Sequence, residues 1–268
     1  MPLSLAPHHQ RALDAFVAHM QQQPESLAVI VGGSLAKGWG TDASDVDVMA
    51  LITDEAFGER YARGDLAWYA PEFADYPHGF VDVKFIDQKY LDDAADRANE
   101  PTRAAFTNAG VAWTRDGNPS ALQSLVRQIA TYPEAGVEER IARFHSELVA
   151  MDWYIGEADK RANAYLASWV GSRAALFAAR MILAHNRVLF PFHKWMLRAL
   201  QDCAERPAGL PEAIDRAVRT PNVETVRSLA SLVTEWRDWP MYQGGWAMGF
   251  IEDVEWAWRY GEGPIDHV

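Results

Sequence analysis

Two aspartates and a glycine-rich turn lie close together near the start of the chain, next to two apolar segments. Asp45 and Asp47 stand two positions apart at the beginning of the second apolar segment, residues 46–52. Residues two apart on a strand project to the same face, so both carboxylates point into one small volume. Like charges this close repel unless a cation lies between them, and hard divalent cations prefer oxygen ligands. The spacing therefore indicates a site for a divalent metal such as magnesium.

The turn Gly32-Gly33-Ser34 follows the first apolar segment, residues 27–31, which is typical of a strand. Glycines allow close approach of a ligand to the backbone, and the N–H groups at the start of a helix bind phosphate oxygens. The turn and the two carboxylates together indicate a magnesium–triphosphate site.

The order of these parts resembles the signature of the DNA polymerase β-type nucleotidyltransferase superfamily. Here that signature is Gly33-Ser34, then Asp45 at 11 positions after Ser34, then Asp45-Val46-Asp47-Val48. The block is most similar to the small bacterial branch, which includes the aminoglycoside and lincosamide nucleotidyltransferases and the minimal nucleotidyltransferase antitoxins. The motif covers 18 of the 268 residues, from Val31 to Val48.

The resemblance implies a third acidic residue on a later strand. Residues 79–86 alternate apolar and polar side chains over the length of a strand, with Asp82 and Lys84 on the polar face. Asp82 is the best candidate by position, either to complete the metal site or to take the proton from an attacking hydroxyl. Asp87, at the end of the same segment, is the second candidate. The alternative is that Asp82 is an exposed carboxylate paired with Lys84.

The resemblance further implies two Mg²⁺ ions, held by Asp45, Asp47 and Asp82, and an NTP substrate, ATP being favoured. Gly33 and Ser34 would bind the β- and γ-phosphates of that nucleotide. Both Asp45 and Asp47 would then be needed for transfer, and their replacement with asparagine should leave the fold intact.

Two lysines are candidate contacts for the phosphates. Lys37 follows the glycine-rich turn, where the alternative is a solvated loop cation. Lys194 lies in the carboxy-terminal half, within a set of residues similar to a helical-domain pattern of uncharacterised bacterial nucleotidyltransferases: Asn186, Pro191, Lys194 and Trp195. If that half caps the cleft, Lys194 would reach the phosphates as a point charge. Otherwise it is a cation at a helix start with a partly buried stem.

The chain is long and apolar enough for two ordinary domains, with 268 residues of which 49% are hydrophobic. Residues 132–136 gather proline and glycine between an alternating helix–strand pattern and a nearly all-helical one. We therefore expect an α/β (α+β) protein. A nucleotidyltransferase domain with a mixed sheet and flanking helices would occupy residues 1–133, and a helical bundle capping the active-site cleft would occupy residues 134–268.

Local patterns predict individual elements. In the first domain they predict strands over 27–31, 46–52, 79–86 and 109–113, helices over 7–22 and 119–131, and a helix with an aromatic-rich connection over 54–74. In the second domain they predict helices over 137–162, 163–189, 193–205, 211–219, 223–237 and 245–260.

Charge and composition limit the partners. The net charge of −12 argues against a nucleic-acid surface, which needs clustered Lys and Arg. The single cysteine, Cys203, excludes an internal disulfide and fits a reducing compartment. No secretory signal opens the sequence, and no apolar stretch approaches the roughly 20 residues of a membrane span. We expect a cytoplasmic monomer or homodimer whose partners are a nucleotide and a small-molecule acceptor, with neither nucleic acid nor membrane.

Three functions remain open at this point. The first is transfer of a nucleoside monophosphate to a small hydroxylated acceptor, such as an aminoglycoside-like antibiotic. The second is modification of a protein, as in toxin–antitoxin pairs, and the third is a non-catalytic nucleotide-binding sensor. The first is favoured because a second domain is large enough to build an acceptor pocket. Three acids of one predicted helix would hold a cationic acceptor or supply a base, unless they form a solvated face: Asp152, Glu157 and Asp159.

Overall fold

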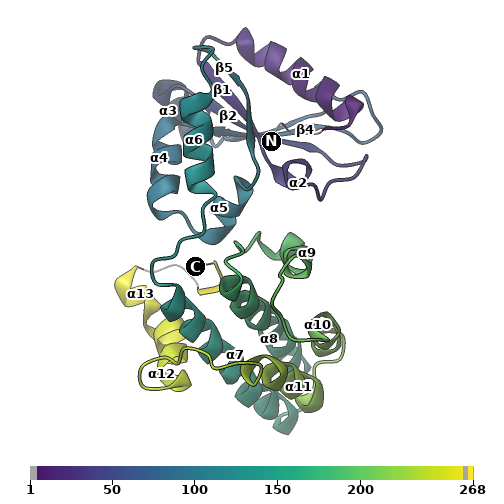
Figure 1. Ribbon diagram of the computed structural model, residues 1–268, viewed down its shortest axis with the longest axis vertical. Coiled ribbons are helices and arrows are strands. Elements are labelled where there is room, and N and C mark those ends of the chain that lie inside the picture. Colours follow the sequence, from purple (N-terminus) through teal and green to yellow (C-terminus); the bar gives the residue numbers. More distant parts are fainter. Residues whose placement is uncertain (1–4, 262–264, 268) are drawn as a thin grey trace. The chain divides into compact units, whose positions relative to one another are not determined.

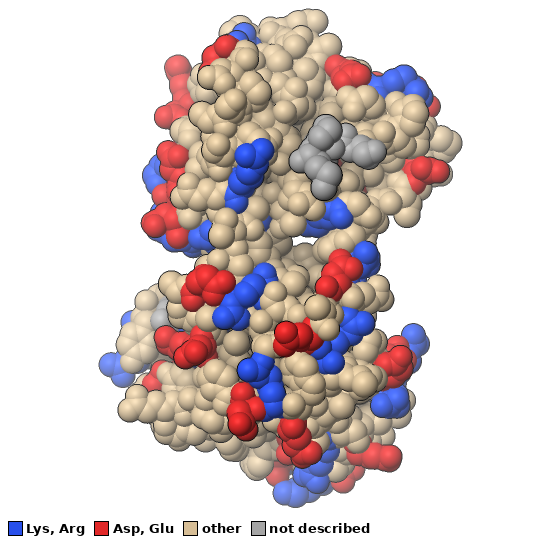
Figure 2. Space-filling view, viewed as in Figure 1, with Lys and Arg blue, Asp and Glu red and all other residues tan. Residues whose placement is uncertain are grey.

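The computed structural model describes residues 5–261 and 265–267 (Figure 1). The chain divides into two compact units, Met1–Thr131 and Tyr132–Val268. The first contains a five-stranded mixed sheet with flanking helices, and the described part of the second contains helices. The fold class expected from the sequence is therefore confirmed. On the face shown in Figure 2, acidic and basic side chains are interspersed.

The sheet of the first unit has the strand order β3-β4-β2-β1-β5. Strands β2 and β4 run parallel, and the other neighbouring pairs are antiparallel. The strands are β1 (Ser26–Val31), β2 (Val46–Ile52), β3 (Ala67–Ala70), β4 (Val81–Ile86) and β5 (Gly110–Thr114). Because β2 and β4 are parallel, the first residues of both lie at the same end of the sheet.

Helices cover both faces of this sheet. Val29 and Val31 of β1 pack with Phe16 of α1 (Pro7–Gln21), whereas Ile30 between them packs on the other face with Leu91 of α4 (Gln88–Arg97). The side-chain alternation of a strand explains this division, since successive residues point to opposite faces. Strands covered on both sides are almost continuously apolar, and β1 and β2 have that composition. The sheet is thus a rigid platform for residues at its ends.

One strand, β3, is not predicted from the sequence patterns. Helix α3 (Asp54–Arg63) forms where a helix is expected, but the connection after it contains the edge strand β3. This strand has only four residues, too few for a periodic pattern to show. Its conformation depends on antiparallel pairing with β4, in which Tyr69 lies opposite Asp82. Pairing partners are not visible in a local window of sequence.

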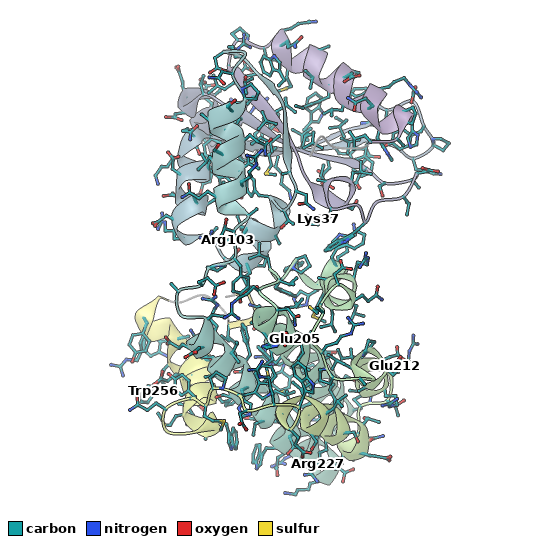
Figure 3. All side chains as sticks on the ribbon, in the orientation of Figure 1. Lys37, Arg103, Glu205, Glu212, Arg227 and Trp256 are labelled. Atoms are coloured by element: carbon teal, nitrogen blue, oxygen red, sulfur yellow. The ribbon has the colours of Figure 1, made fainter. Side chains whose placement is uncertain are left out.

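A buried arginine fixes the helices that follow β4. Arg103, in α5 (Glu100–Ala105), is 6% exposed and donates hydrogen bonds to the backbone oxygens of Asp96, Ala98 and Ile129 at 3.1, 2.9 and 3.3 Å (Figure 3). These oxygens lie at the ends of α4 and α6 (Ser120–Ile129). The guanidinium therefore satisfies carbonyls that the two helices leave unpaired.

The second unit is built around two long helices, α7 (Val137–Lys160) and α8 (Ala164–His185). Shorter α-helices follow: α9 (Met196–Gln201), α10 (Leu210–Arg219), α11 (Val223–Thr234), α12 (Trp246–Ile251) and α13 (Ala257–Tyr260). A π-helical segment, Glu252–Trp256, joins the last two. Among the described residues, α8 alone is long and apolar enough to cross a membrane by length and composition. However, 67% of its apolar window is buried, as in the central helix of a bundle.

Charged side chains lie inside this helical unit. Glu147 of α7 is fully buried, and one of its oxygens accepts a hydrogen bond from Arg173 of α8 at 2.7 Å. Arg173 also pairs with Asp266 at 2.9 Å, so one cation serves two carboxylates. The other oxygen of Glu147, Oε1, has no hydrogen-bond partner among the described residues. Burial raises the pKa of Glu147 to about 7, although Arg173 acts in the opposite direction.

Candidate metal centre

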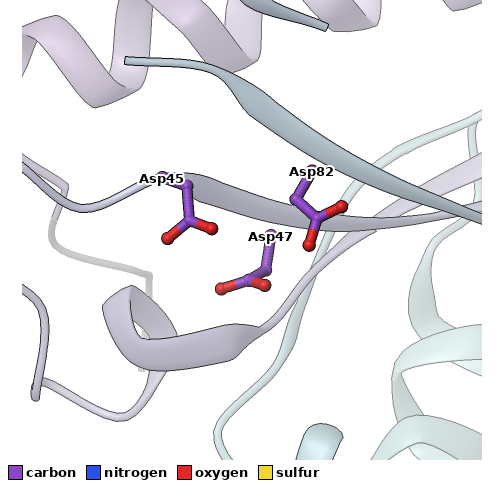
Figure 4. A group of neighbouring side chains, drawn as sticks. All are labelled: Asp45, Asp47 and Asp82. Carbon is purple, nitrogen blue, oxygen red and sulfur yellow. The ribbon is translucent and has the colours of Figure 1, made fainter. Parts of the chain in front are cut away.

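Three aspartates meet at the end of the sheet where β2 and β4 begin (Figure 4). Asp45 directly precedes β2, Asp47 is inside it, and Asp82 is inside β4. The parallel pairing places Asp47 directly opposite Asp82. One carboxylate oxygen from each aspartate lies within 4.8 Å of the others, and all three residues are half-buried. The structure thus brings together the three acidic residues that the sequence singles out.

The electrostatics of the cluster favour a bound cation. Burial raises the pKa of Asp47, and the charges of Asp45 and Asp82 raise it further. Lys84 and a hydrogen bond from the backbone of Ser34 act in the opposite direction without cancelling this rise. Among the described residues, no ion pair joins Asp82 to Lys84. Three converging carboxylate oxygens fit a hard divalent cation such as Mg²⁺, which prefers oxygen ligands.

The glycine-rich turn leads from β1 into this cluster. Gly33 and Ser34 open a single helical turn, α2 (Gly33–Ala36), and Gly33 has a φ of 67°. The N–H of Gly32 donates to the backbone oxygen of Asp47 at 3.0 Å, which ties the turn to β2. Ser34 is buried, and its backbone hydrogen bond to the carboxylate of Asp47 joins the turn to the cluster. Contact of Gly33 and Ser34 with phosphates stays a prediction.

Two residues hold the loop before Asp45. The sequence alone gives no reason to single them out. The hydroxyl of Tyr76 donates to the backbone oxygen of Ser44 at 2.8 Å, and Nε2 of His9 lies 3.0 Å from the same oxygen. His9 comes from α1, and Tyr76 from the connection between β3 and β4. Both are more than 30 positions from Ser44, so no local pattern reports these contacts. They position the backbone that carries Asp45.

Lys37 lies at the end of α2, beside the cluster. Its Nζ donates to the backbone oxygen of Gly33 at 3.3 Å, and its side chain is partly buried. Burial lowers the pKa of Lys37 to about 8, although the negative charge of Asp47 acts to raise it. The ammonium group is therefore close enough to Asp47 for their charges to interact.

Asp87, the second candidate for the third acid, is not part of this cluster. Asp87 caps α4 and accepts a hydrogen bond from the N–H of Tyr90 at 2.7 Å. Lys194 is in the helical unit, exposed, with Nζ 5.4 Å from the centroid of the Trp195 ring, and its phosphate contact stays a prediction.

Two of the three acids proposed for α7, Asp152 and Glu157, form ion pairs. Asp152 pairs with Arg227 at 3.1 Å and Glu157 with Lys160 at 2.8 Å, which is typical of a solvated helix face.

Comparison with known proteins adds little to this geometry. No protein-family model matches the chain, and no curated protein matches it. Among solved structures, the chain is similar to a nucleotidyltransferase-like protein from Exiguobacterium sibiricum. The TM-score is 0.43 and the sequence identity 14%, over 94% of this chain and 77% of that one. A likeness this distant has no bearing on the activity of this chain, so function must follow from the site itself.

Proposed function

We propose that this chain is a magnesium-dependent nucleotidyltransferase. It moves a nucleoside monophosphate from an NTP, ATP being favoured, to a hydroxyl group of a small-molecule acceptor. The observation that supports this function is the cluster of Asp45, Asp47 and Asp82, whose oxygens converge within 4.8 Å beside the Gly33-Ser34 turn.

In this proposal Asp45, Asp47 and Asp82 hold Mg²⁺. A metal held there would supply charge neutralisation on the phosphate oxygens and would make the acceptor hydroxyl more acidic. The backbone N–H of Gly33 and the hydroxyl of Ser34 bind the β- and γ-phosphates, because an N–H group that opens a helical turn has no partner within it, whereas the backbone N–H of Ser34 already donates to Asp47. Tyr76 and His9 hold Ser44, and thereby keep Asp45 in place.

The reaction forms one bond and breaks one. The acceptor oxygen bonds to the α-phosphorus, and the bond from that phosphorus to the oxygen bridging to the β-phosphate breaks, so that pyrophosphate leaves. The proton of the hydroxyl passes to Asp82, if that residue acts as the base, or to solvent. Positioning of the reacting groups and stabilisation of charge on the phosphates supply most of the catalysis in reactions of this kind.

Transfer of label from the nucleotide tests this function. The protein is incubated with Mg²⁺ and ATP, GTP, CTP or UTP labelled at the α-phosphate, together with aminoglycosides, lincosamides and a bacterial metabolite extract. An Asp45→Asn/Asp47→Asn double variant serves as the control. Label on a small molecule with the wild type alone supports the proposal and gives the mass of the acceptor.

Two other outcomes of this assay would favour a different function. Label on protein would favour a protein-modifying enzyme of the toxin–antitoxin type. Magnesium-dependent nucleotide binding without any transfer would favour a non-catalytic sensor. The acceptor-binding role of residues 134–268, the contact of Lys194, the cytoplasmic location and the monomeric or dimeric state stay predictions from the sequence.

A further inference from the structure

A pocket of about 520 Å³ lies in the first unit, between one face of the sheet and the first half of α6. Figure 1 shows α6 beside α4 over that face. The reaction proposed above uses none of the residues that line the pocket. Its volume is that of a site for a small molecule. Six of the eleven lining residues are leucine or alanine: Leu27, Ala28, Leu51, Ala121, Leu122 and Leu125.

The floor of the pocket is an incompletely filled part of the core. Ala28 and Leu51 are buried on their strands, whereas Leu122 and Leu125 of α6 pack in the same cluster but are only partly buried. Ala28 has a single methyl group and fills little of the space between them. Protein cores are packed as tightly as organic crystals, so a hollow lined by leucines is unusual. A ligand that covers this apolar surface removes it from water, which favours binding.

The two charged residues at the rim of the pocket already have partners. Arg115 donates to the backbone oxygen of Ser26 at 2.5 Å. Oδ1 of Asp116 accepts a hydrogen bond from the N–H of Asn118 at 3.0 Å, which holds the pKa of Asp116 below its usual range. One cation and one anion, each with a partner, give the pocket no preference for a ligand of either charge.

Two amide side chains at the rim have groups available for a neutral ligand. Nε2 of Gln88 donates to Asp92 at 2.9 Å, and Oδ1 of Asn118 accepts from the N–H of Ser120 at 3.3 Å. In the part of the chain that the structure describes, the side-chain oxygen of Gln88 and the NH₂ group of Asn118 have no hydrogen-bond partner. One group accepts and the other donates, so a hydroxyl or an amide can bond to either.

The pocket is separate from the aspartate cluster, although both lie on one face of the sheet. Leu51 follows Asp47 by four positions on β2, which corresponds to about 13 Å along the strand. Met49 lies between them on the same face and is buried. A molecule in the pocket therefore lies beyond Met49 from the aspartates, and both sites can be occupied together.

We propose that this pocket binds a small neutral molecule that has an apolar body and one hydroxyl or amide group. The apolar body covers Leu51, Leu122 and Leu125. The polar group bonds to the side-chain amide of Gln88 or Asn118 at the rim. This site does not depend on the proposed nucleotidyltransferase function, because it shares no residue with the aspartate cluster.

Binding of 1-hexanol tests the chemical class of the ligand. The alcohol is titrated into the wild type and followed by saturation-transfer NMR, beside hexanoate and hexylammonium, which have the same number of carbons but carry a charge. We expect 1-hexanol to bind about tenfold more tightly than either ion, because the rim has no unpaired charge to replace the water around them. Addition of Mg²⁺ and ATP should not displace the alcohol.

A filled pocket should lose this binding. Ala121 is exposed on α6 and lines the pocket, so Ala121→Phe places a ring at its mouth without entering the core. The variant should bind 1-hexanol about tenfold more weakly. Ala62→Phe, the same change at an exposed position of α3 outside the pocket, should bind like the wild type. In methyl NMR of the wild type, the signals of Leu122 and Leu125 should shift with 1-hexanol, and those of Leu148 in the second unit should not.

Several results would overturn the assignment. If millimolar 1-hexanol does not bind the wild type, or if Ala121→Phe and Ala62→Phe bind it equally well, the pocket is not its site. Shifts of Leu148 without shifts of Leu122 and Leu125 would place the alcohol in the helical unit. Equally tight binding of hexanoate or hexylammonium would contradict the neutral class. Displacement of the alcohol by Mg²⁺ and ATP would show that the pocket and the aspartate cluster are not separate.

Discussion

The α-carbon of Gly33 lies directly against the carboxylate of Asp47. A Cβ atom added at Gly33 would stand 1.7 Å from Oδ2 of Asp47, far inside van der Waals contact. Gly33 also has a φ of 67°, a conformation that glycine alone adopts without strain. The turn and the carboxylate of Asp47 therefore fit together only when residue 33 has no side chain.

Gly33→Ala should accordingly abolish transfer and magnesium-dependent nucleotide binding, because the new methyl group displaces the carboxylate of Asp47. The positive φ should also lower the free energy of unfolding by about 1–2 kcal/mol. Gly58→Ala in α3 is the matched control, since a Cβ there meets nothing within 4 Å. The control should keep its activity and gain roughly 0.5–1 kcal/mol of stability. Full activity in Gly33→Ala would show that Asp47 is not a metal ligand.

Replacement of a single aspartate of the cluster by asparagine should lower activity without lowering stability. Asp47→Asn should lower the rate of transfer by about 100-fold or more, since it removes a metal ligand. In metal-free buffer the same variant should be more stable than the wild type, because it removes a partly buried charge and relieves repulsion by Asp45 and Asp82. Mg²⁺ should raise the melting temperature of the wild type but not that of the variant.

Asp87→Asn is the control for this series. Asparagine caps a helix about as well as aspartate does, so α4 and the activity should be unchanged. A large loss of activity in Asp87→Asn would instead place that residue in the site and count against Asp82.

Tyr76→Phe tests whether the hydrogen bond from Tyr76 to Ser44 holds the loop before Asp45 in place. The variant keeps the ring but removes the hydrogen bond to the backbone oxygen of Ser44, leaving His9 alone on that oxygen. We expect a loss of about 1 kcal/mol in the free energy of unfolding and a several-fold lower rate of transfer. Tyr61→Phe, at a side chain that is 70% exposed, should change neither quantity. Wild-type kinetics in Tyr76→Phe would mean that Asp45 needs no such anchor.

Glu147 should make the stability of the protein depend on pH. Its pKa rises from 4.5 to about 7 on folding, so the folded state binds the proton more tightly than the unfolded state does. The stabilisation is complete below pH 4.5 and is lost as the pH rises through about 7. In chemical denaturation, the wild type should lose on the order of 2 kcal/mol more than Glu147→Gln does across this range.

Glu212→Gln, at an exposed position of α10, should follow the wild type over the same pH range. Parallel pH profiles for the wild type and Glu147→Gln would show that Arg173 keeps Glu147 ionised despite its burial.

The strands that carry the cluster could be predicted because their patterns are local. The apolar run of β2 and the alternation of β4 are visible within a few residues, and they place Asp47 and Asp82 on strands. The strand of Asp47 begins one residue after Asp45, so the spacing of two still brings both carboxylates together.

The parts that could not be predicted depend on contacts between distant residues. The register that sets Asp47 opposite Asp82 arises from strand pairing, and only the resemblance to a known superfamily suggested it. The edge strand β3 forms through its pairing with β4, and the anchors Tyr76 and His9 reach Ser44 from other elements. The pocket between the sheet and α6 is lined by β1, β2 and α6, which are separate in the sequence.

The pairing of β2 with β4 makes assembly of the three-aspartate cluster an all-or-none event. A slip of one residue would turn Asp82 to the opposite face of the sheet and bring Val81 or Val83 into its place. A slip of two residues would restore the face but move the carboxylate about 6.6 Å along the strand, which is more than the 4.8 Å that now encloses the three oxygens. No neighbouring register therefore offers a weaker version of the site. A chain with a slipped register would lack the cluster altogether, so any metal binding that depends on the three aspartates would report correct folding of the sheet.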